Sequence, residues 1–222
     1  MFASLCAVCH GWGRGRVCAG CRAVHAPVQP RCPRCALPVA GAALVCLECR
    51  RAPPPQAAAV AALDYGFPWD RLVSAFKYHG AIELATPLAG LLADAVRGAG
   101  LDAPSCVLPV PLGPRRLRER GYNQAWEVAR RVARTLGLPA RADGLQRWLD
   151  GEHQVGHTRA ERIAALRGAF GVDPAQASRW QGRTVALVDD VMTSGATATE
   201  ASRVLLAAGA AAVQVWVVAR TA

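Results

Sequence analysis

Four segments of the chain are apolar at nearly every position, and the stretches between them alternate between apolar and polar residues with a helical period. The apolar segments predict strands at residues 58–66, 105–112, 183–190 and 211–220. The intervening stretches predict helices, at residues 68–80, 86–100, 122–137 and 196–209. Strands that are apolar on both faces and alternate with helices are typical of a parallel sheet covered on both sides. The pattern therefore predicts an α/β fold for the larger part of the chain.

Capping residues mark the expected ends of two of these helices. Asn123 is a candidate N-cap for the third predicted helix, and Gly137 is expected to end it. Thr86 is the expected N-cap of the second, with Pro87 at the first helical position.

The first 50 residues lack this alternation and carry four C-x-x-C pairs. Two such pairs hold one metal ion tetrahedrally, as in structural zinc sites. Disulfides suit secreted chains, but the N-terminus lacks the basic and long apolar segments of a secretory signal. We expect one or two structural Zn²⁺ ions, with neighbouring and interleaved pairing both open. The expected ligands are Cys6, Cys9, Cys18, Cys21, Cys32, Cys35, Cys46 and Cys49, while Cys106, the ninth cysteine, is expected to be a buried core residue.

A proline-rich spacer, Arg50–Gln56, separates the cysteine-rich part from the α/β part. It favours two domains, a zinc-ribbon module at residues 1–52 and a main domain at residues 57–222. Because the short module has few residues for a core of its own, its folding is expected to depend on the metal.

Charge adds a candidate partner. The net charge is +10, and Lys77 is the only lysine among 26 basic residues. Two explanations stay open: a coding bias towards arginine, or a phosphate-rich partner, since the guanidinium group matches phosphate oxygens. No apolar run is long enough to span a membrane, so we expect a cytoplasmic location without membrane insertion.

The segment 184–202 carries the main candidate site. Asp189 and Asp190 end an apolar strand, and a small-residue loop, Thr193–Thr197, leads into a helix. Backbone N–H groups, hydroxyls and a helix N-terminus suit a phosphate monoester. The carboxylates would repel that phosphate, but they suit sugar hydroxyls or Mg²⁺. A ribose 5-phosphate combines both groups in one ligand.

A second basic cluster follows the strand at 105–112. Its four arginines within six residues provide enough positive charge to bind a diphosphate, and they are Arg115, Arg116, Arg118 and Arg120.

Two of these stretches resemble known proteins. VALVDDVMTSGAT resembles the motif of type I phosphoribosyltransferases that binds 5-phosphoribosyl-1-diphosphate (PRPP). VLPVPLGPRRLRERGYNQA, followed by that motif and preceded by a cysteine-rich segment, resembles the competence-associated ComF family over essentially the whole chain. The resemblance implies a type I phosphoribosyltransferase-like parallel sheet flanked by helices, behind a double zinc ribbon.

The resemblance also implies roles for individual residues. Asp189 and Asp190 would hold the ribose hydroxyls and Mg²⁺, and together with Arg115 and Lys77 they are the candidate catalytic residues. The 5-phosphate would be bound by Thr193, Ser194, Gly195, Ala196 and Thr197, and the pyrophosphate by Pro111, Leu112, Arg115 and Arg116. Gln154 and Arg162 match a hood segment, in which Ala165 replaces a usual asparagine and His157 a usual leucine.

Three functions stay open at this point. The first is a protein that binds PRPP or a related ribose phosphate and acts on single-stranded DNA in natural competence, with competence or recombination proteins as partners. The second is a metabolic phosphoribosyltransferase that joins PRPP to a nucleobase and releases pyrophosphate. The third is a non-catalytic interaction module. No motif identifies an acceptor base, so the sequence leaves open whether the protein is an enzyme.

Overall fold

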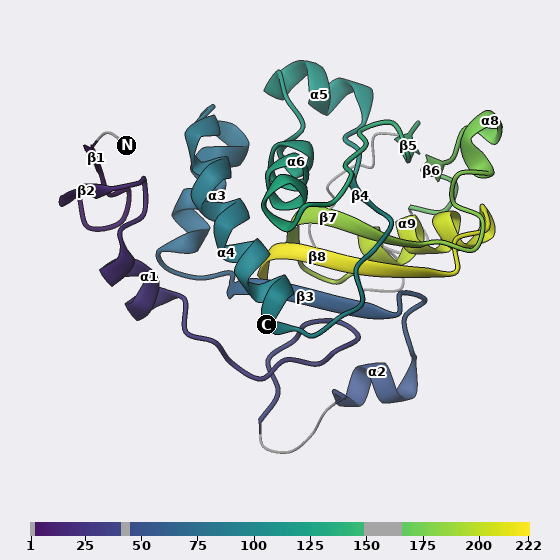
Figure 1. Cartoon of the computed structure of the whole chain (residues 1–222), viewed down its shortest axis with the longest axis horizontal. Coiled ribbons are helices and arrows are strands. Elements are labelled where there is room, and N and C mark those ends of the chain that lie inside the picture. Colours follow the sequence, from purple (N-terminus) through teal and green to yellow (C-terminus); the bar gives the residue numbers. More distant parts are fainter. Residues whose placement is uncertain (1–2, 41–44, 149–165) are drawn as a thin grey trace.

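A four-stranded parallel sheet forms the centre of the molecule in the computed structural model, which describes residues 3–40, 45–148 and 166–222 (Figure 1). The strand order is β3-β8-β7-β4. In register, Val60 of β3 and Val188 of β7 both lie beside Trp216 of β8. The strands are β3 (Ala58–Asp64), β4 (Cys106–Pro109), β7 (Thr184–Met192) and β8 (Ala212–Arg220).

Both faces of the sheet are buried, as the apolar strand segments predict. On one face, the strands pack with α3 (Trp69–Tyr78), α4 (Ala85–Gly98) and α6 (Gln124–Leu136). On the other face they pack with α9 (Ala196–Ala207) and with residues around Phe170 and Trp180. The expected α/β fold with helices on both sides is therefore confirmed, and Cys106 is a buried core residue.

The helix ends differ from expectation at one place. A short 3₁₀ helix, η1 (Ile82–Leu84), runs directly into α4, so the N-cap is Leu84 and Thr86 lies inside the first turn. The prediction of Thr86 as N-cap was wrong because the preceding turn already continues the helical path. Asn123 does cap α6, accepting hydrogen bonds from the backbone N–H groups of Ala125 and Trp126, and Gly137 ends that helix.

Short elements complete the described fold. The helix α5 (Pro114–Arg120) connects β4 to α6, and none of its residues is buried. The strands β5 (Gln146–Arg147) and β6 (Phe170–Gly171) pair antiparallel, and α8 (Pro174–Ala177) precedes β7. The predicted hood residues Gln154 and Arg162 lie outside the described residues.

The cysteine-rich part has little regular structure and packs against the α/β part. It contains the β1 (Ala3–Leu5) and β2 (Trp12–Arg14) pair and the helices α1 (Ala19–His25) and α2 (Leu47–Arg51). Cys6 and Ala36 are fully buried, one in the core on each face of the sheet. The division into domains at residues 50–56 stays a prediction.

No helix in the described parts of the chain has the length and apolar character needed to cross a membrane.

Candidate ribose-phosphate site and metal centres

Two adjacent aspartates occupy the carboxyl-terminal part of β7. Pairing with β4 ends at Val188, so Asp189 and Asp190 lie just beyond the neighbouring strand. The Asp190 backbone N–H donates to Asp189 Oδ1 at 2.8 Å, and the Val191 N–H donates to Asp190 Oδ1 at 2.6 Å. Asp189 is half-buried, and Asp190 is buried. Ligands of open parallel sheets bind at this edge.

Lys77, in the last turn of α3, forms an ion pair with this acid pair. Its Nζ lies 2.9 Å from Asp190 Oδ1, and the Lys77 and Asp190 side chains are 18% and 5% exposed. The second carboxylate oxygen, Asp190 Oδ2, is buried and accepts no hydrogen bond from the described residues. The structure thus brings three of the predicted residues together and leaves one buried acceptor atom for another group.

Burial raises the pKa of Asp189 to about 7, and the neighbouring charge of Asp190 adds to the rise, while Lys77 opposes it. Burial acts to lower the pKa of Lys77, but the carboxylate of Asp190 outweighs it and raises that pKa above its usual value. Lys77 is therefore charged at neutral pH. Asp189 changes its charge near neutrality, and a bound cation would favour its ionised form.

Replacing Lys77, the cation of this ion pair, should destabilise the protein, because the buried carboxyl group of Asp190 then lacks its partner. We expect Lys77→Met to lower the free energy of unfolding by about 2 kcal/mol, because the buried carboxyl group of Asp190 loses its ion-pair partner. Urea denaturation at pH 7 measures the change. The double variant with Asp190→Asn, which removes both charges, should recover part of the loss. A double variant whose loss equals the sum of the two single losses would show that the pair contributes nothing.

The loop after the acid pair leads directly into a helix N-terminus. Gly195 has φ 76°, a left-handed conformation that favours glycine, and α9 begins at Ala196. The first N–H groups of a helix have no acceptor within the helix. The Ser194 hydroxyl accepts from the N–H of Ala196 at 3.4 Å. Thr193 is exposed and Thr197 half-buried, so the predicted loop places hydroxyl groups beside the N-terminus of α9.

A basic hollow of about 520 Å³ lies between the end of α3 and α5. It is lined by four basic residues, Lys77, Arg115, Arg116 and Arg120. The guanidinium group of Arg120 lies 5.0 Å from the centre of the Tyr78 ring. Pro111 and Leu112 follow β4 but do not line the hollow. Because Lys77 also contacts Asp190, this hollow adjoins the acid pair.

Two tyrosines in this region have different roles. Tyr122 donates its hydroxyl to the carbonyl of Phe76 and packs on that ring, so it is a structural residue. Tyr78 is 62% exposed at the rim of the hollow, and no sequence pattern points to it, since an isolated tyrosine at a helix end is common. A second residue that the sequence analysis missed is Arg220, a buried charge at the end of an apolar strand. An arginine at the end of an otherwise apolar strand could have identified it from the sequence.

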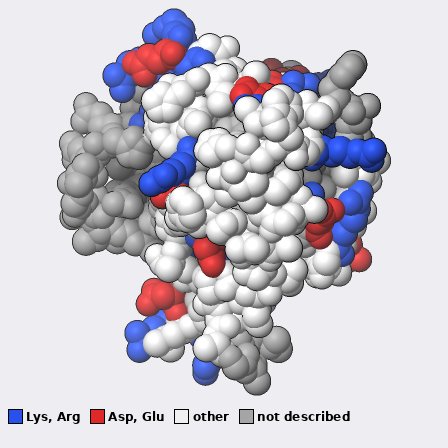
Figure 2. All heavy atoms as spheres, turned by 90° about the vertical axis from the view of Figure 1, so that its left-hand side faces the viewer, with Lys and Arg blue, Asp and Glu red and all other residues white. Residues whose placement is uncertain are grey.

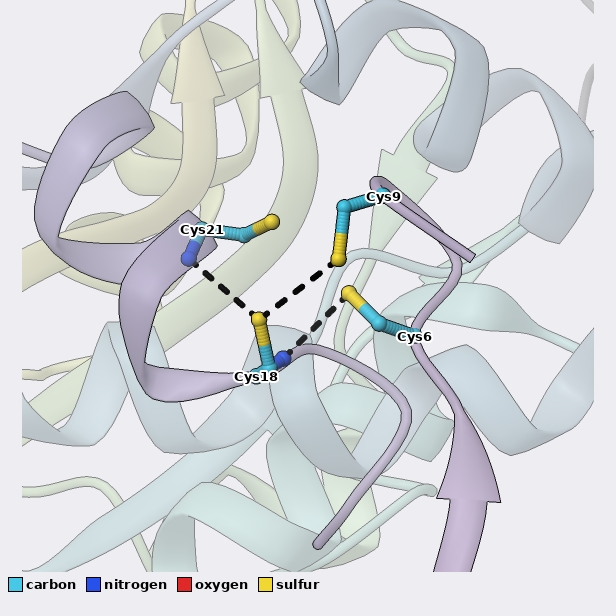
Figure 3. A group of neighbouring side chains, drawn as sticks. All are labelled: Cys6, Cys9, Cys18 and Cys21. Carbon is cyan, nitrogen blue, oxygen red and sulfur yellow. Dashed lines mark hydrogen bonds between the residues drawn. The ribbon is translucent and has the colours of Figure 1, made fainter. Parts of the chain in front are cut away.

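The eight paired cysteines form two separate groups. Neighbouring pairs combine, so that Cys6, Cys9, Cys18 and Cys21 form the first group, and Cys32, Cys35, Cys46 and Cys49 the second. The sulfurs of each group lie within 4.8 Å of one another. Figure 3 shows the four side chains of the first group pointing towards a common centre. Cys9 Sγ lies 3.8 Å from Cys18 Sγ, and Cys35 Sγ lies 3.5 Å from Cys46 Sγ.

These distances fit zinc. Four sulfurs at about 2.3 Å from a tetrahedral ion lie about 3.8 Å apart. Burial would raise the pKa of Cys6, but backbone N–H groups, led by that of Cys18, outweigh it and lower the pKa to about 6. Burial raises the pKa of Cys21 to about 12, and the nearby Cys18 adds to the rise. One thiolate is thus favoured, whereas four ionised thiols require a cation between them.

The fold and these sites define an α/β protein with a four-stranded parallel sheet that also carries two Cys₄ groups. The chain is 37% identical over 215 residues to the DNA utilization protein YhgH of Salmonella typhimurium, covering 95% of this chain and 91% of that protein. It is 32% identical over 208 residues to the competence protein F of Haemophilus influenzae, covering 92% and 90%. The chain belongs to the ComF family.

Comparison with solved structures gives a weaker likeness. The glutamine PRPP amidotransferase from Bacillus subtilis, complexed with ADP and GMP, superimposes with a TM-score of 0.42 and 19% identity. The match covers 62% of this chain and 27% of that one, so it is a partial superposition. No protein-family model matches the chain.

Proposed function

We propose that the protein binds Mg²⁺-PRPP, or a related ribose phosphate, at the carboxyl edge of the sheet. One observation carries the proposal: the acid pair on β7 is followed by the loop that leads to the N-terminus of α9, and Lys77 joins the pair to an arginine-lined hollow. A ligand with a monophosphate, a diol and a diphosphate needs these three environments side by side. The resemblance of VALVDDVMTSGAT to the PRPP-binding motif of type I phosphoribosyltransferases supports this ligand class.

Each group of residues has a distinct task in this proposal. The N–H groups and hydroxyls of residues 193–197 would bind the 5-phosphate. Asp189 would accept hydrogen bonds from the ribose hydroxyls, and its carboxylate and that of Asp190 supply the hard oxygen atoms that Mg²⁺ prefers. Arg115 and Arg116 would neutralise the diphosphate. Bound Mg²⁺ would add charge stabilisation at the diphosphate.

Calorimetry with Mg²⁺-PRPP tests this assignment directly. We expect saturable one-site binding by the purified, zinc-loaded protein, and competition by ribose 5-phosphate, which carries the monophosphate and the diol. A folded, zinc-loaded protein that releases no heat and shows no competition would refute the proposal.

The same preparation should be screened for pyrophosphate release with the common nucleobases. Turnover with one base would establish the alternative, a metabolic phosphoribosyltransferase.

We further propose a role in natural competence with single-stranded DNA as a partner. The names of the relatives, DNA utilization protein and competence protein F, support it. The basic residues support it as well. Figure 2 shows basic and acidic side chains side by side at the top of the view, at the height of α5 in Figure 1, and further basic side chains around a largely uncharged central area. A cytosolic location and binding to competence or recombination proteins belong to the same proposal.

Salt dependence separates DNA binding at α5 from a general effect of charge. We expect Arg115→Ala with Arg116→Ala to weaken binding of a single-stranded oligonucleotide and to reduce the slope of log K against log [NaCl] by about 1 to 1.5, because each lost phosphate contact on a single strand removes about 0.7. Fluorescence anisotropy at several NaCl concentrations measures both quantities. Arg134→Ala with Arg183→Ala removes the same charge near the opposite edge of the sheet and should leave the slope unchanged. Equal slopes for the two double variants would contradict a site at α5.

A further inference from the structure

A single buried arginine connects the second Cys₄ group to the loop at 193–197. Arg220, the last residue of β8, is 6% exposed. Its Nε donates to the carbonyl of Cys35 at 3.0 Å, and its Nη1 donates to the carbonyls of Met192 and Thr193 at 3.0 and 2.5 Å. The rigid guanidinium therefore spans from a cysteine of the second group to the start of the loop.

The segment around Cys35 is held against the sheet by further contacts. Ala36 is fully buried in the core formed with β7 and β8, although its φ of 57° is unusual for a residue with a side chain. The carbonyl of Pro33 accepts from the N–H of Ala59 in β3 at 2.7 Å, and the carbonyl of Arg34 accepts from the buried side chain of Gln56 at 3.0 Å. The turn that carries Cys35 is thus fixed against the α/β part at several points.

Anchoring two carbonyls on the arginine also sets the direction of two N–H groups. Across a trans peptide bond the C=O and the N–H point in opposite directions, and the only cis peptide among the described residues is at Pro68. With the carbonyls of Met192 and Thr193 turned towards Arg220, the N–H groups of Thr193 and Ser194 point away from it. These two N–H groups belong to the loop that is proposed to bind the 5-phosphate.

We propose that Arg220 is a positioning residue that couples the second Cys₄ group to the phosphate-binding loop, so that metal in this group favours the ligand-binding conformation. The inference rests on the proposed function, because it assigns the loop to a phosphate. It gives the second group a role through the carbonyl of Cys35, which lies 3.0 Å from Arg220 Nε. By thermodynamic linkage, the factor by which metal in the second group strengthens ligand binding must equal the factor by which the ligand strengthens metal binding there.

Hydrogen exchange tests the coupling without any ligand. Cys46→Ser and Cys18→Ser are a matched pair, because both residues are half-buried and belong to the second and first groups respectively. We expect Cys46→Ser to raise the exchange rates of the amides at 193–197 about tenfold, while those of Val185–Val188 in the core of β7 stay unchanged. Cys18→Ser should leave the loop at the wild-type rate. Equal loop exchange in the two variants, or faster exchange throughout β7, would overturn the coupling.

The reciprocal effect distinguishes a positioning role from simple stabilisation. A chelator that reports zinc release should remove metal from the second group about tenfold more slowly when Mg²⁺-PRPP is present, with no change for the first group. The two variants show which phase of zinc release belongs to which group: Cys46→Ser should lack the phase of the second group, and Cys18→Ser that of the first. Arg220→Lys, which keeps the charge but lacks the planar fork, should abolish the difference. Protection that persists in Arg220→Lys would assign the coupling to another contact. Absence of PRPP binding by the wild type would refute the proposed function, whereas the exchange experiment would still decide the coupling.

Discussion

Replacing Asp189 with asparagine is expected to weaken binding of Mg²⁺-PRPP about 100-fold. Hydrogen bonds to a charged group contribute up to about 3 kcal/mol, and about 1.4 kcal/mol corresponds to a factor of ten. Asparagine keeps the oxygen that accepts the N–H of Asp190, so the local backbone contact is preserved. Calorimetry measures the affinity, and Asp102→Asn, an exposed acid before β4, is the matched control. Unchanged affinity would remove Asp189 from the site.

The same variant should also change stability with pH. Because the pKa of Asp189 is raised from 3.8 to about 7 in the folded protein, the folded state holds a proton that the unfolded state has lost over that range. Stability contributed by this group is therefore fully present at acidic pH and decreases as the pH rises towards 7. We expect Asp189→Asn to be more stable than the wild type at pH 8 by up to about 4 kcal/mol, since each pKa unit corresponds to about 1.4 kcal/mol, and the difference to vanish near pH 4.

The structure argues against using Asp190 alone for this test. Asp190→Asn would leave Lys77 largely buried without its carboxylate, so a loss of binding would be mixed with a loss of folding. Asp189 makes no ion pair of this kind among the described residues, and its substitution isolates the chemistry of the site.

Loss of one cysteine from either group should remove one zinc ion and unfold its surroundings. We expect two ions per wild-type chain and one in Cys6→Ser or Cys32→Ser, because both residues are fully buried and a three-sulfur site binds zinc more weakly. Structural zinc contributes on the order of 10 kcal/mol to the folding of small zinc modules, so the thermal transition should fall strongly. Metal analysis of protein from zinc-supplemented growth gives the ion count.

The ninth cysteine provides the control. Cys106 is buried in β4 and belongs to neither group, so Cys106→Ser should retain both ions. Two ions in both Cys6→Ser and Cys32→Ser would refute the assignment of the Cys₄ groups. One ion in the wild type would show that only one group holds metal.

The sheet and its two covered faces could be predicted from the sequence because parallel strands leave a strong local signal. Segments such as β7 and β8 are apolar at almost every position, and no neighbouring contact is needed to recognise them. Thr86 shows the limit of local rules. The sequence around Thr86 is typical of a helix start, but the turn of η1 places the N-cap two residues earlier, at Leu84.

The candidate site was predictable where its residues are adjacent in the sequence. Asp189, Asp190 and the loop form one continuous motif, and the arginines of α5 form another. Two other features depend on residues far apart in the chain: the ion pair of Lys77 with Asp190 and the contacts of Arg220. Those contacts arise only when the sheet assembles, so a local pattern cannot specify them. The hood roles of Gln154 and Arg162, which lie outside the described residues, remain predictions.

The attachment of α5 has a consequence for how the family could diversify. The segment is tied down just before it, where the Val110 N–H donates to the Val188 carbonyl, and just after it, where the Asn123 side chain donates to the Val110 carbonyl and caps α6. Between these two ties none of the residues of α5 contributes to a core. Selection can therefore exchange its side chains, and with them the preferred anionic ligand, with little penalty in stability. A library randomised at 115–120 would offer a direct route to altered selectivity.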